Sequence, residues 1–287
     1  MIPRWNSVLH SIKVFVQSLN KIVTHRFKKN NRGRKPKHSI RSYFKLIIAK
    51  EAKNASLREA EVDYSKSVCR TRVDHSVIHY WEKKFDKGVI ENLVKRIGIK
   101  IENLLGYIFS VIDSTDFTRW NRSNISFHLM NRISKQTVYP VSISFGDDAD
   151  SIKEMLMEGK KELYADSWYD QNKTFKALIE NGYTPIIKPN KDRWKGYWRH
   201  KARKFWNPIN KLKYRQRGRG ESCFGSLTNE FGDRLKTSRI DTSITRIGAR
   251  IIAYLTKIYI RISILLGIVR HAHKIIKLMN SKSKIKQ

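Results

Sequence analysis

The stretch Tyr107–Asp113, YIFSVID, decides the fold. It is a nearly continuous apolar run that ends in a carboxylate, which is typical of a strand buried on both faces at the centre of a sheet. A second short run, Glu162–Asp166 (ELYAD), also ends on an aspartate. Because neighbouring strands lie about 5 Å apart, the two carboxylates are expected side by side if the strands are neighbours.

Other periodic segments predict the elements around these two strands. Apolar residues that alternate or repeat at helical spacing, together with turn residues such as those at Asn181 and Gly182, set their limits. The pattern predicts an α/β fold, a mixed sheet flanked by helices. The expected elements are strands at 126–130, 138–145 and 183–188, and helices at 151–159, 173–180, 222–235 and 244–279.

The charge of the chain predicts a polyanionic partner. Lys and Arg total 59 against 25 Asp and Glu, a formal net charge of +34. No acidic residue occurs in residues 1–50, and none follows Asp241. A compact chain with this charge repels itself unless it is neutralised, and the phosphate backbone of DNA is the expected partner.

The N-terminal third is predicted to be helical and basic. Residues 27–38, FKKNNRGRKPKH, form a linker or a DNA-tracking arm, and Ser56 with Glu59 fits a capping box that starts a new helix. Helices rich in Arg and Lys favour a helix-turn-helix-like DNA-binding module. The alternative is a helical bundle whose charges only face water.

Other classes of site are not indicated. Cys69 and Cys223 stand far apart without a CxxC pattern, so neither a disulfide framework nor a zinc site is expected. The most apolar stretch, 251–269, is interrupted by Lys257 and Arg261, which argues against a membrane span. No secretion signal is apparent near the N-terminus, and we expect a protein of the prokaryotic cytoplasm without a membrane partner.

Three carboxylates carry the expected chemistry. Asp113 and Asp166 would hold divalent cations, and Glu221, near the start of a helix, would complete the site. Each ligand has a competitor in the sequence, and Asp113 could instead be a turn or cap residue at the end of its strand. The competitors are Asp116 for Asp113, Asp170 for Asp166 and Glu230 for Glu221.

Three segments resemble a known family. They are Val111–Thr115 (VIDST), Tyr164–Tyr169 (YADSWY) and Tyr214–Leu227 (YRQRGRGESCFGSL). They look like the signature segments of DDE transposases of prokaryotic insertion sequences, and Gly33–Pro36 and Ser56–Glu59 are similar to the DNA-binding region of that family. The resemblance implies a ribonuclease-H-like fold, and catalysis by Asp113, Asp166 and Glu221 with two Mg²⁺ ions, Mn²⁺ being an alternative.

The family often carries Tyr, Arg, Glu and Lys on one helical face of the third segment. Tyr214, Arg217 and Glu221 match the first three, whereas Thr228 stands at the Lys position. The resemblance implies that the Lys of the family contacts phosphates of the transposon end, and Tyr214 and Arg217 are expected to bind DNA. Arg215, Arg219 or Arg234 is expected to substitute for the missing Lys.

Basic and aromatic residues interleave between Lys188 and Arg219, where thirteen Lys and Arg accompany a single acid, Asp192. This pattern suits a groove that neutralises phosphates and stacks an exposed base on Trp194 or Trp198. The alternative is a small aromatic core with a solvated basic face. The remaining DNA-binding predictions are Arg34, Lys35 and Arg58.

The sequence therefore predicts a transposase that acts on duplex DNA, the terminal inverted repeats and the target, as a homodimer in the synaptic complex. Two alternatives stay open: a catalytically silent basic nucleic-acid-binding protein, and a structure-selective nuclease on the same fold. The expected divisions are a basic N-terminal helix and linker at 1–38, a helical DNA-binding domain at 39–105, a ribonuclease-H-like catalytic domain at 106–280 and a basic tail at 281–287.

Overall fold

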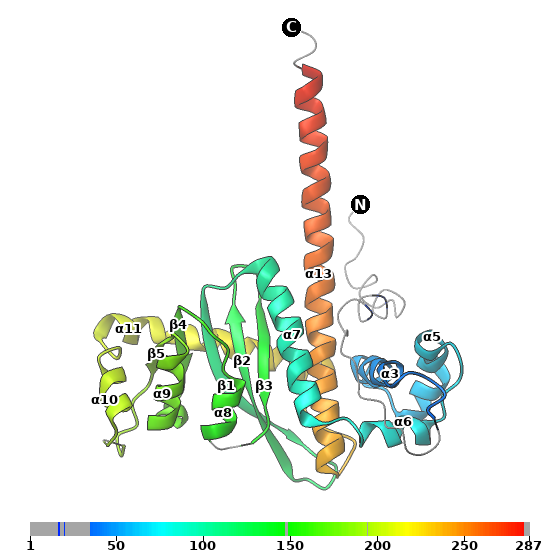
Figure 1. Ribbon diagram of the computed structural model, residues 1–287, viewed down its shortest axis with the longest axis horizontal. Helices are drawn as coiled ribbons and strands as arrows, with labels where there is room; N and C mark the ends of the chain where they lie inside the picture. The colour runs from blue at the N-terminus through cyan, green and yellow to red at the C-terminus, as the bar shows by residue number, and fades with distance from the viewer. Residues whose placement is uncertain (1–16, 18–19, 21–34, 147–148, 194, 284–287) are drawn as a thin grey trace.

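A five-stranded mixed sheet forms the centre of the computed structural model, which describes residues 17, 20, 35–146, 149–193 and 195–283 (Figure 1). The strand order is β3-β2-β1-β4-β5. The first three strands are antiparallel, and β4 and β5 run parallel to β1. This arrangement confirms the ribonuclease-H-like α/β fold. The strands are β1 (Phe109–Thr118), β2 (Asn124–Ile133), β3 (Val138–Ser144), β4 (Glu162–Ala165) and β5 (Thr184–Ile187).

Strand β1 is longer than its apolar run. It continues past Asp113 to Thr118 because β2 pairs with it over its whole length, up to Thr118 opposite Asn124. On its other side, β4 pairs with Ser110 and Val111. Asp113 therefore lies within β1, just beyond the point where the pairing with β4 stops, and not at the strand end that the sequence predicted.

Helices cover both faces of the sheet. In Figure 1, α7 (Lys87–Leu105), α8 (Ala149–Met155) and α9 (Asn172–Glu180) lie in front of the strands, and α12 (Gly218–Phe231), in yellow, passes behind them. Helix α7 packs closely on β3, since a Cβ on Gly98 would lie 2.5 Å from the Cα of Val141. The helix α7 thus covers the sheet although it precedes β1.

The N-terminal helices lie across α13 (Ile240–Ser283) from the sheet (Figure 1). Helix α3 packs on α13 and on the helices that follow it. Ser56 and Glu59 form the expected capping box in both directions. These helices are α3 (Ile40–Ala52), α4 (Leu57–Glu59), η1 (Ala60–Tyr64), α5 (Ser65–Cys69) and α6 (His75–Glu82).

Helix α13 is a single helix of 44 residues, longer at both ends than the expected 244–279. Its first half is buried against α3, α7 and α12, and its second half extends away from the rest of the molecule (Figure 1). Within the residues that the structure describes, no helix contains a stretch both long and apolar enough to traverse a lipid bilayer.

Five buried charged side chains join α3 and α6 to α13, and we call them the buried ion cluster: Lys50, Glu51, Glu82, Arg246 and Arg250. Glu51 accepts from Arg250 Nε at 2.8 Å, and Glu82 accepts from Arg246 Nη2 at 2.9 Å and lies 3.1 Å from Lys50 Nζ. The arginines also donate to backbone carbonyls of the segment that follows α12. Arg250 donates to the carbonyl of Gly232, and Arg246 donates to the carbonyl of Lys236. The cluster therefore connects the N-terminal helices to the segment that follows α12.

Candidate active site

Asp113 and Asp166 come from neighbouring parallel strands. The register pairs Ser110 with Leu163 and Val111 with Tyr164. Asp113 and Asp166 each lie two residues beyond this last pair, on their own strands. Asp113 is buried, and its Oδ1 accepts a hydrogen bond from the Ser114 backbone N–H at 3.0 Å. The two carboxylates are thus held at the same edge of the β1–β4 pair.

Asp166 is half-buried at the point where β4 gives way to a short 3₁₀ turn, η2 (Ser167–Tyr169). Its Oδ1 caps that turn by accepting from the Trp168 backbone N–H at 2.9 Å. The cap uses one carboxylate oxygen and leaves the other for a further partner.

Glu221 lies in the first turn of α12, which begins at Gly218 and not at Ser222 as the sequence predicted. Neither Gly218 nor Gly220 interrupts the helix. A Cβ on Gly220 would lie 2.5 Å from Cγ1 of Val111, so glycine lets α12 rest directly on β1. Val111 and Asp113 point to the same face of β1 because side chains alternate along a strand. The close approach therefore places α12 over the face that carries Asp113.

Arg217 bridges two of the three carboxylates. Its Nη1 donates to Asp113 Oδ2 at 2.8 Å, and its Nη2 donates to Glu221 Oε1 at 2.6 Å. It belongs to the turn η3 (Tyr214–Arg217), which precedes α12. The Tyr214 hydroxyl donates to the carbonyl of Ala165 at 3.2 Å, beside Asp166. The predicted Tyr, Arg and Glu thus lie together against both strands.

The electrostatics of Asp113 favour a cation. Burial raises the pKa of Asp113, and the negative charges of Asp166 and Glu221 raise it further. Arg217 and the Ser114 N–H lower it without cancelling these effects. Burial lowers the pKa of Arg217, but the charges of Asp113, Tyr214, Glu221 and Asp166 raise it overall. The ionised carboxylates would therefore be stabilised by additional positive charge.

The donor set fits a hard divalent cation because all three side chains offer carboxylate oxygens. Glu221 is accessible, with 56% of its side chain exposed. Within the described residues, three ligand atoms come within 4.8 Å of one another at Glu61, Asp74 and His75, in the N-terminal helices. The carboxylates of Asp113, Asp166 and Glu221 are more widely spaced than the ligand atoms of that group. The Arg217 guanidinium stands between Asp113 and Glu221.

The competing carboxylates have structural partners or face elsewhere. Asp116 is exposed on the opposite face of β1 from Asp113. Asp170 is buried and accepts from Arg199 Nε at 2.7 Å and from the Asn190 N–H at 2.6 Å. Glu230 forms an ion pair with Lys257 of α13. Asp170 and Glu230 therefore have structural partners, and Asp116 points away from the face that carries Asp113.

The predicted DNA-binding arginines differ in their surroundings. Arg215 is exposed and belongs to the same turn, η3, as Arg217. Arg219 donates to the carbonyl of Ser134 at 3.3 Å and lies over the ring of Phe109. Thr228 donates to the Phe224 carbonyl within its own helix. Lys35 and Arg58 are exposed on the N-terminal side, and Arg34 lies outside the described residues.

The aromatic segment contains both packed and exposed aromatic side chains. Trp198 is half-buried against the main core, and Trp206 stacks edge-to-face on Tyr214. Tyr197, in contrast, is 69% exposed. Trp194 lies outside the described residues. Trp198 thus has a packing role that the sequence could not distinguish from base stacking.

One aromatic residue beside the site was missed. Trp168 is 38% exposed, two residues after Asp166, and stacks on His128 with ring centroids 5.2 Å apart. Its position in the YADSWY segment was the available signal. Trp168 offers an open ring surface next to the carboxylates.

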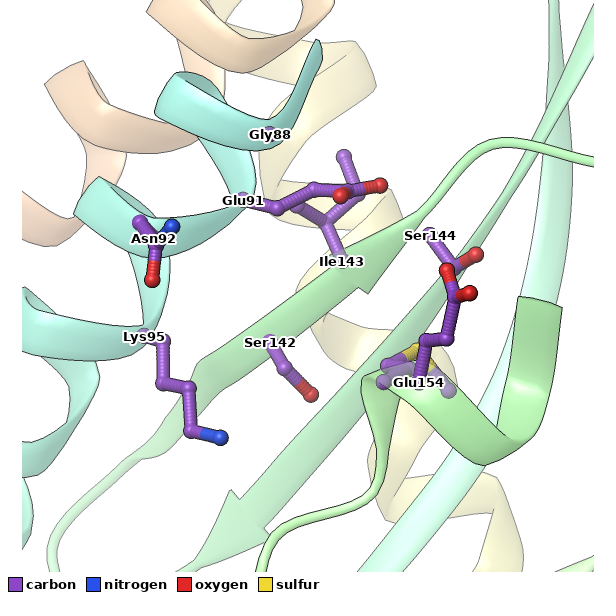
Figure 2. Close-up of a pocket in the computed structure, with 9 residues that line it drawn as sticks. Gly88, Glu91, Asn92, Lys95, Ser142, Ile143, Ser144 and Glu154 are labelled. Carbon is purple, nitrogen blue, oxygen red and sulfur yellow. The ribbon is translucent and has the colours of Figure 1, made fainter.

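A hollow of about 180 Å³ lies elsewhere, between α7, β3 and α8 (Figure 2). Glu91 and Glu154 flank it, and Lys95 points toward it from the next turn of α7. Burial raises the pKa of Glu91, and nearby Glu154 adds to this. The hollow contains none of the predicted site residues.

Comparison with known families agrees with this geometry. Residues 105–256 match the family model described as a transposase DDE domain, which is more than half of the 287 residues. The match spans Asp113, Asp166 and Glu221. A comparison with curated proteins gives no match.

Proposed function

Because the chain belongs to the transposase DDE domain family, we propose that it cleaves the ends of a transposable element and joins the freed 3′ ends to target DNA. The observation that carries the proposal is the convergence of Asp113 and Asp166, from adjacent parallel strands, with Glu221 from the first turn of α12. Arg217, which bridges Asp113 and Glu221, supports a site that attracts positive charge.

We assign Asp113, Asp166 and Glu221 as the side chains that would hold two Mg²⁺ ions, with Mn²⁺ as an alternative. When bound, such ions supply the positive charge that activates an attacking oxygen and stabilises a leaving oxygen. The raised pKa of Asp113, caused by burial and by its acidic neighbours, is consistent with carboxylates that need such a partner. Tyr214 and Arg217 would orient DNA phosphates at the same edge, with Arg215 beside them.

The proposed reaction has two phosphoryl transfers. In the first, a water oxygen bonds to phosphorus, the bond to the 3′ oxygen breaks, and a 3′-hydroxyl and a 5′-phosphate are released. In the second, that 3′-hydroxyl oxygen bonds to a phosphorus of the target strand and displaces a target 3′ oxygen, which takes up a proton. No covalent enzyme intermediate is required.

The proposed partners follow from this reaction. The net charge of +34 suits duplex DNA, both the terminal repeats and the target. Two ends must be brought together, so we propose a homodimer in the synaptic complex, acting on DNA in the prokaryotic cytoplasm.

Glu221→Gln tests the proposal because it keeps the shape of the side chain and removes its charge. On duplexes that contain the DNA flanking the gene, we expect cleavage with Mg²⁺ or Mn²⁺ to fall about 1000-fold, equivalent to roughly 4 kcal/mol, while binding persists. The matched control is Glu230→Gln, which should still cleave because Glu230 faces Lys257.

Two outcomes would contradict the proposal. A metal-independent protein that binds DNA and never cuts it would be a silent binding protein. Cleavage without any joined product on target DNA would indicate a structure-selective nuclease.

A further inference from the structure

The helices α4 to α6 have the arrangement of a helix-turn-helix. The continuous helical segment from Leu57 to Cys69 is followed by a short turn and then by α6, and α3 packs on both. Arg70 in the turn adopts a left-handed conformation, with φ of 67°. In such motifs the second helix enters the major groove while the first crosses the DNA backbone.

Hydrogen bonds to Glu61 hold the start of α6 in place on its inner side. This buried carboxylate accepts from the His75 backbone N–H at 3.0 Å and lies 2.9 Å from His75 Nδ1. It also pairs with Arg72 in the turn, at 2.8 Å. Asp74 caps the helix by accepting from the Ser76 N–H at 2.8 Å. The orientation of the turn and of the first turn of α6 is therefore set by hydrogen bonds.

The inner face of α6 is fixed along its length. Ile78 is buried, Trp81 stacks on Tyr43 with centroids 5.0 Å apart, and Glu82 enters the buried ion cluster through Arg246 and Lys50. A helix held at both ends by buried charges cannot rotate without breaking those pairs. The face that it presents outward is thus preorganised.

The outer face of α6 is polar and carries no exposed acid from Ser76 to Lys84, because Glu82 is buried. Ser76 and Tyr80 lie four residues apart on one side of the helix, and Lys84 lies in the turn that follows it. Tyr80 is 51% exposed, and Lys84 lies over its ring at 5.5 Å. The Ser76 hydroxyl donates to Asp74 Oδ1 and can still accept a hydrogen bond from a base edge. The Tyr80 hydroxyl stands on a ring that Lys84 covers, so a group that can bond a base edge lies near a cation that can bond a phosphate.

We propose that α6 is the helix that reads the transposon-end DNA in the major groove, with Ser76 and Tyr80 contacting bases. Lys83 and Lys84 contact phosphates, and Arg58, exposed on α4, contacts the backbone that the first helix crosses. This assignment rests on the proposed function, and it names the surface by which the enzyme selects its ends.

The test is selection of bound duplexes from a random-sequence library by the full-length protein. Wild type should enrich a sequence motif. Tyr80→Ala and Ser76→Ala should each reduce discrimination between that motif and a shuffled duplex by about tenfold at one or two base positions. Trp120→Ala is the matched control, since Trp120 is 71% exposed outside α6, and it should enrich the wild-type motif.

The lysines should behave differently from the base-reading residues. Lys83→Gln combined with Lys84→Gln should weaken binding to the motif and to shuffled duplexes alike, and should lower the slope of log affinity against log salt by about 2. Because all four side chains are on the surface, melting temperatures should stay at the wild-type value.

An unchanged motif in both the Tyr80→Ala and the Ser76→Ala selections would overturn the assignment of α6. That failure is distinct from failure of the proposed function, since metal-dependent cleavage that is lost in Glu221→Gln would still stand.

Discussion

The buried ion cluster sets two carboxylates against three cations, whereas the candidate active site sets three carboxylates against the guanidinium of Arg217. The consequences are opposite for the acids involved. Burial raises the pKa of Glu51, but Lys50, Arg250 and Arg246 outweigh it and hold the pKa at about 2. At Asp113 burial and acidic neighbours prevail, and the pKa is raised.

The buried ion cluster has a structural use of charge, and the candidate active site has the charge imbalance that the proposed function needs. The cluster satisfies its carboxylates internally and is closed to solvent, so it holds α3, α6 and α13 together. The candidate active site leaves its carboxylates short of positive charge and keeps Glu221 accessible. Removing one carboxylate should therefore damage stability in the first case and catalysis in the second.

The largest expected effect on stability is that of Glu82→Gln. This change leaves Lys50 and Arg246 buried with less than their counter-charge, and we expect a loss of about 3–5 kcal/mol in the free energy of unfolding. Urea denaturation measures it. Glu221→Gln is the comparison, since relief of repulsion among carboxylates should leave the metal-free protein as stable as wild type or slightly more so. Equal destabilisation by both changes would remove the distinction.

Acid titration should show the next largest effect. The pKa of Glu51 is about 2 in the folded protein, against 4.5 for an ordinary Glu, so its contribution is present above pH 4.5 and is lost as pH falls toward 2. The shift corresponds to roughly 3 kcal/mol. Asp113, with its raised pKa, acts in the other direction, because its protonation favours the folded state.

The measurement is the free energy of unfolding of wild type and of Glu51→Gln in this pH window. The variant should be less stable at pH 5 and should lose less stability on acidification. A parallel decline in both proteins would show that Glu51 is not the source.

The smallest effect concerns Gly220, where a methyl group would collide with Val111. Gly220→Ala should push the start of α12 away from β1, at a cost of about 1–3 kcal/mol in stability. Because Glu221 is the next residue, cleavage should fall as well, by about tenfold or more.

Gly218→Ala is the matched control for that change, because no atom lies within 4 Å of its added Cβ. It should keep wild-type cleavage and gain up to about 1 kcal/mol from its better helix propensity. Equal cleavage by the two variants would mean that the contact with Val111 does not position Glu221.

The central strands and their two aspartates could be predicted because buried strands appear in the sequence as apolar runs. The first run ends on Asp113, and the second ends on Asp166. The extension of β1 to Thr118 could not, since polar residues there are kept extended by pairing with β2. The sequence placed the start of α12 too late because glycine has a low helix propensity. At Gly220, however, the close contact between α12 and Val111 leaves room for no residue larger than glycine.

The buried ion cluster gave no signal in the sequence. Charged residues in helical segments normally face water, and Glu51 and Arg250 are 199 positions apart. Trp198 illustrates the same limit for aromatic residues, because packing on the core and stacking on a base call for the same side chain.

The two arginines of the cluster also give the molecule a fixed measuring distance. Arg246 joins Glu82 of α6 to the carbonyl of Lys236, and Arg250 joins Glu51 of α3 to the carbonyl of Gly232. Both carbonyls belong to the segment that follows the helix that carries Glu221. If α6 reads the DNA and the carboxylates cut it, as proposed, the scissile bond would stand a set number of base pairs from the recognised sequence. Adding or deleting a base pair between them would move the bond away from the carboxylates, so the ends of the element would share one spacing.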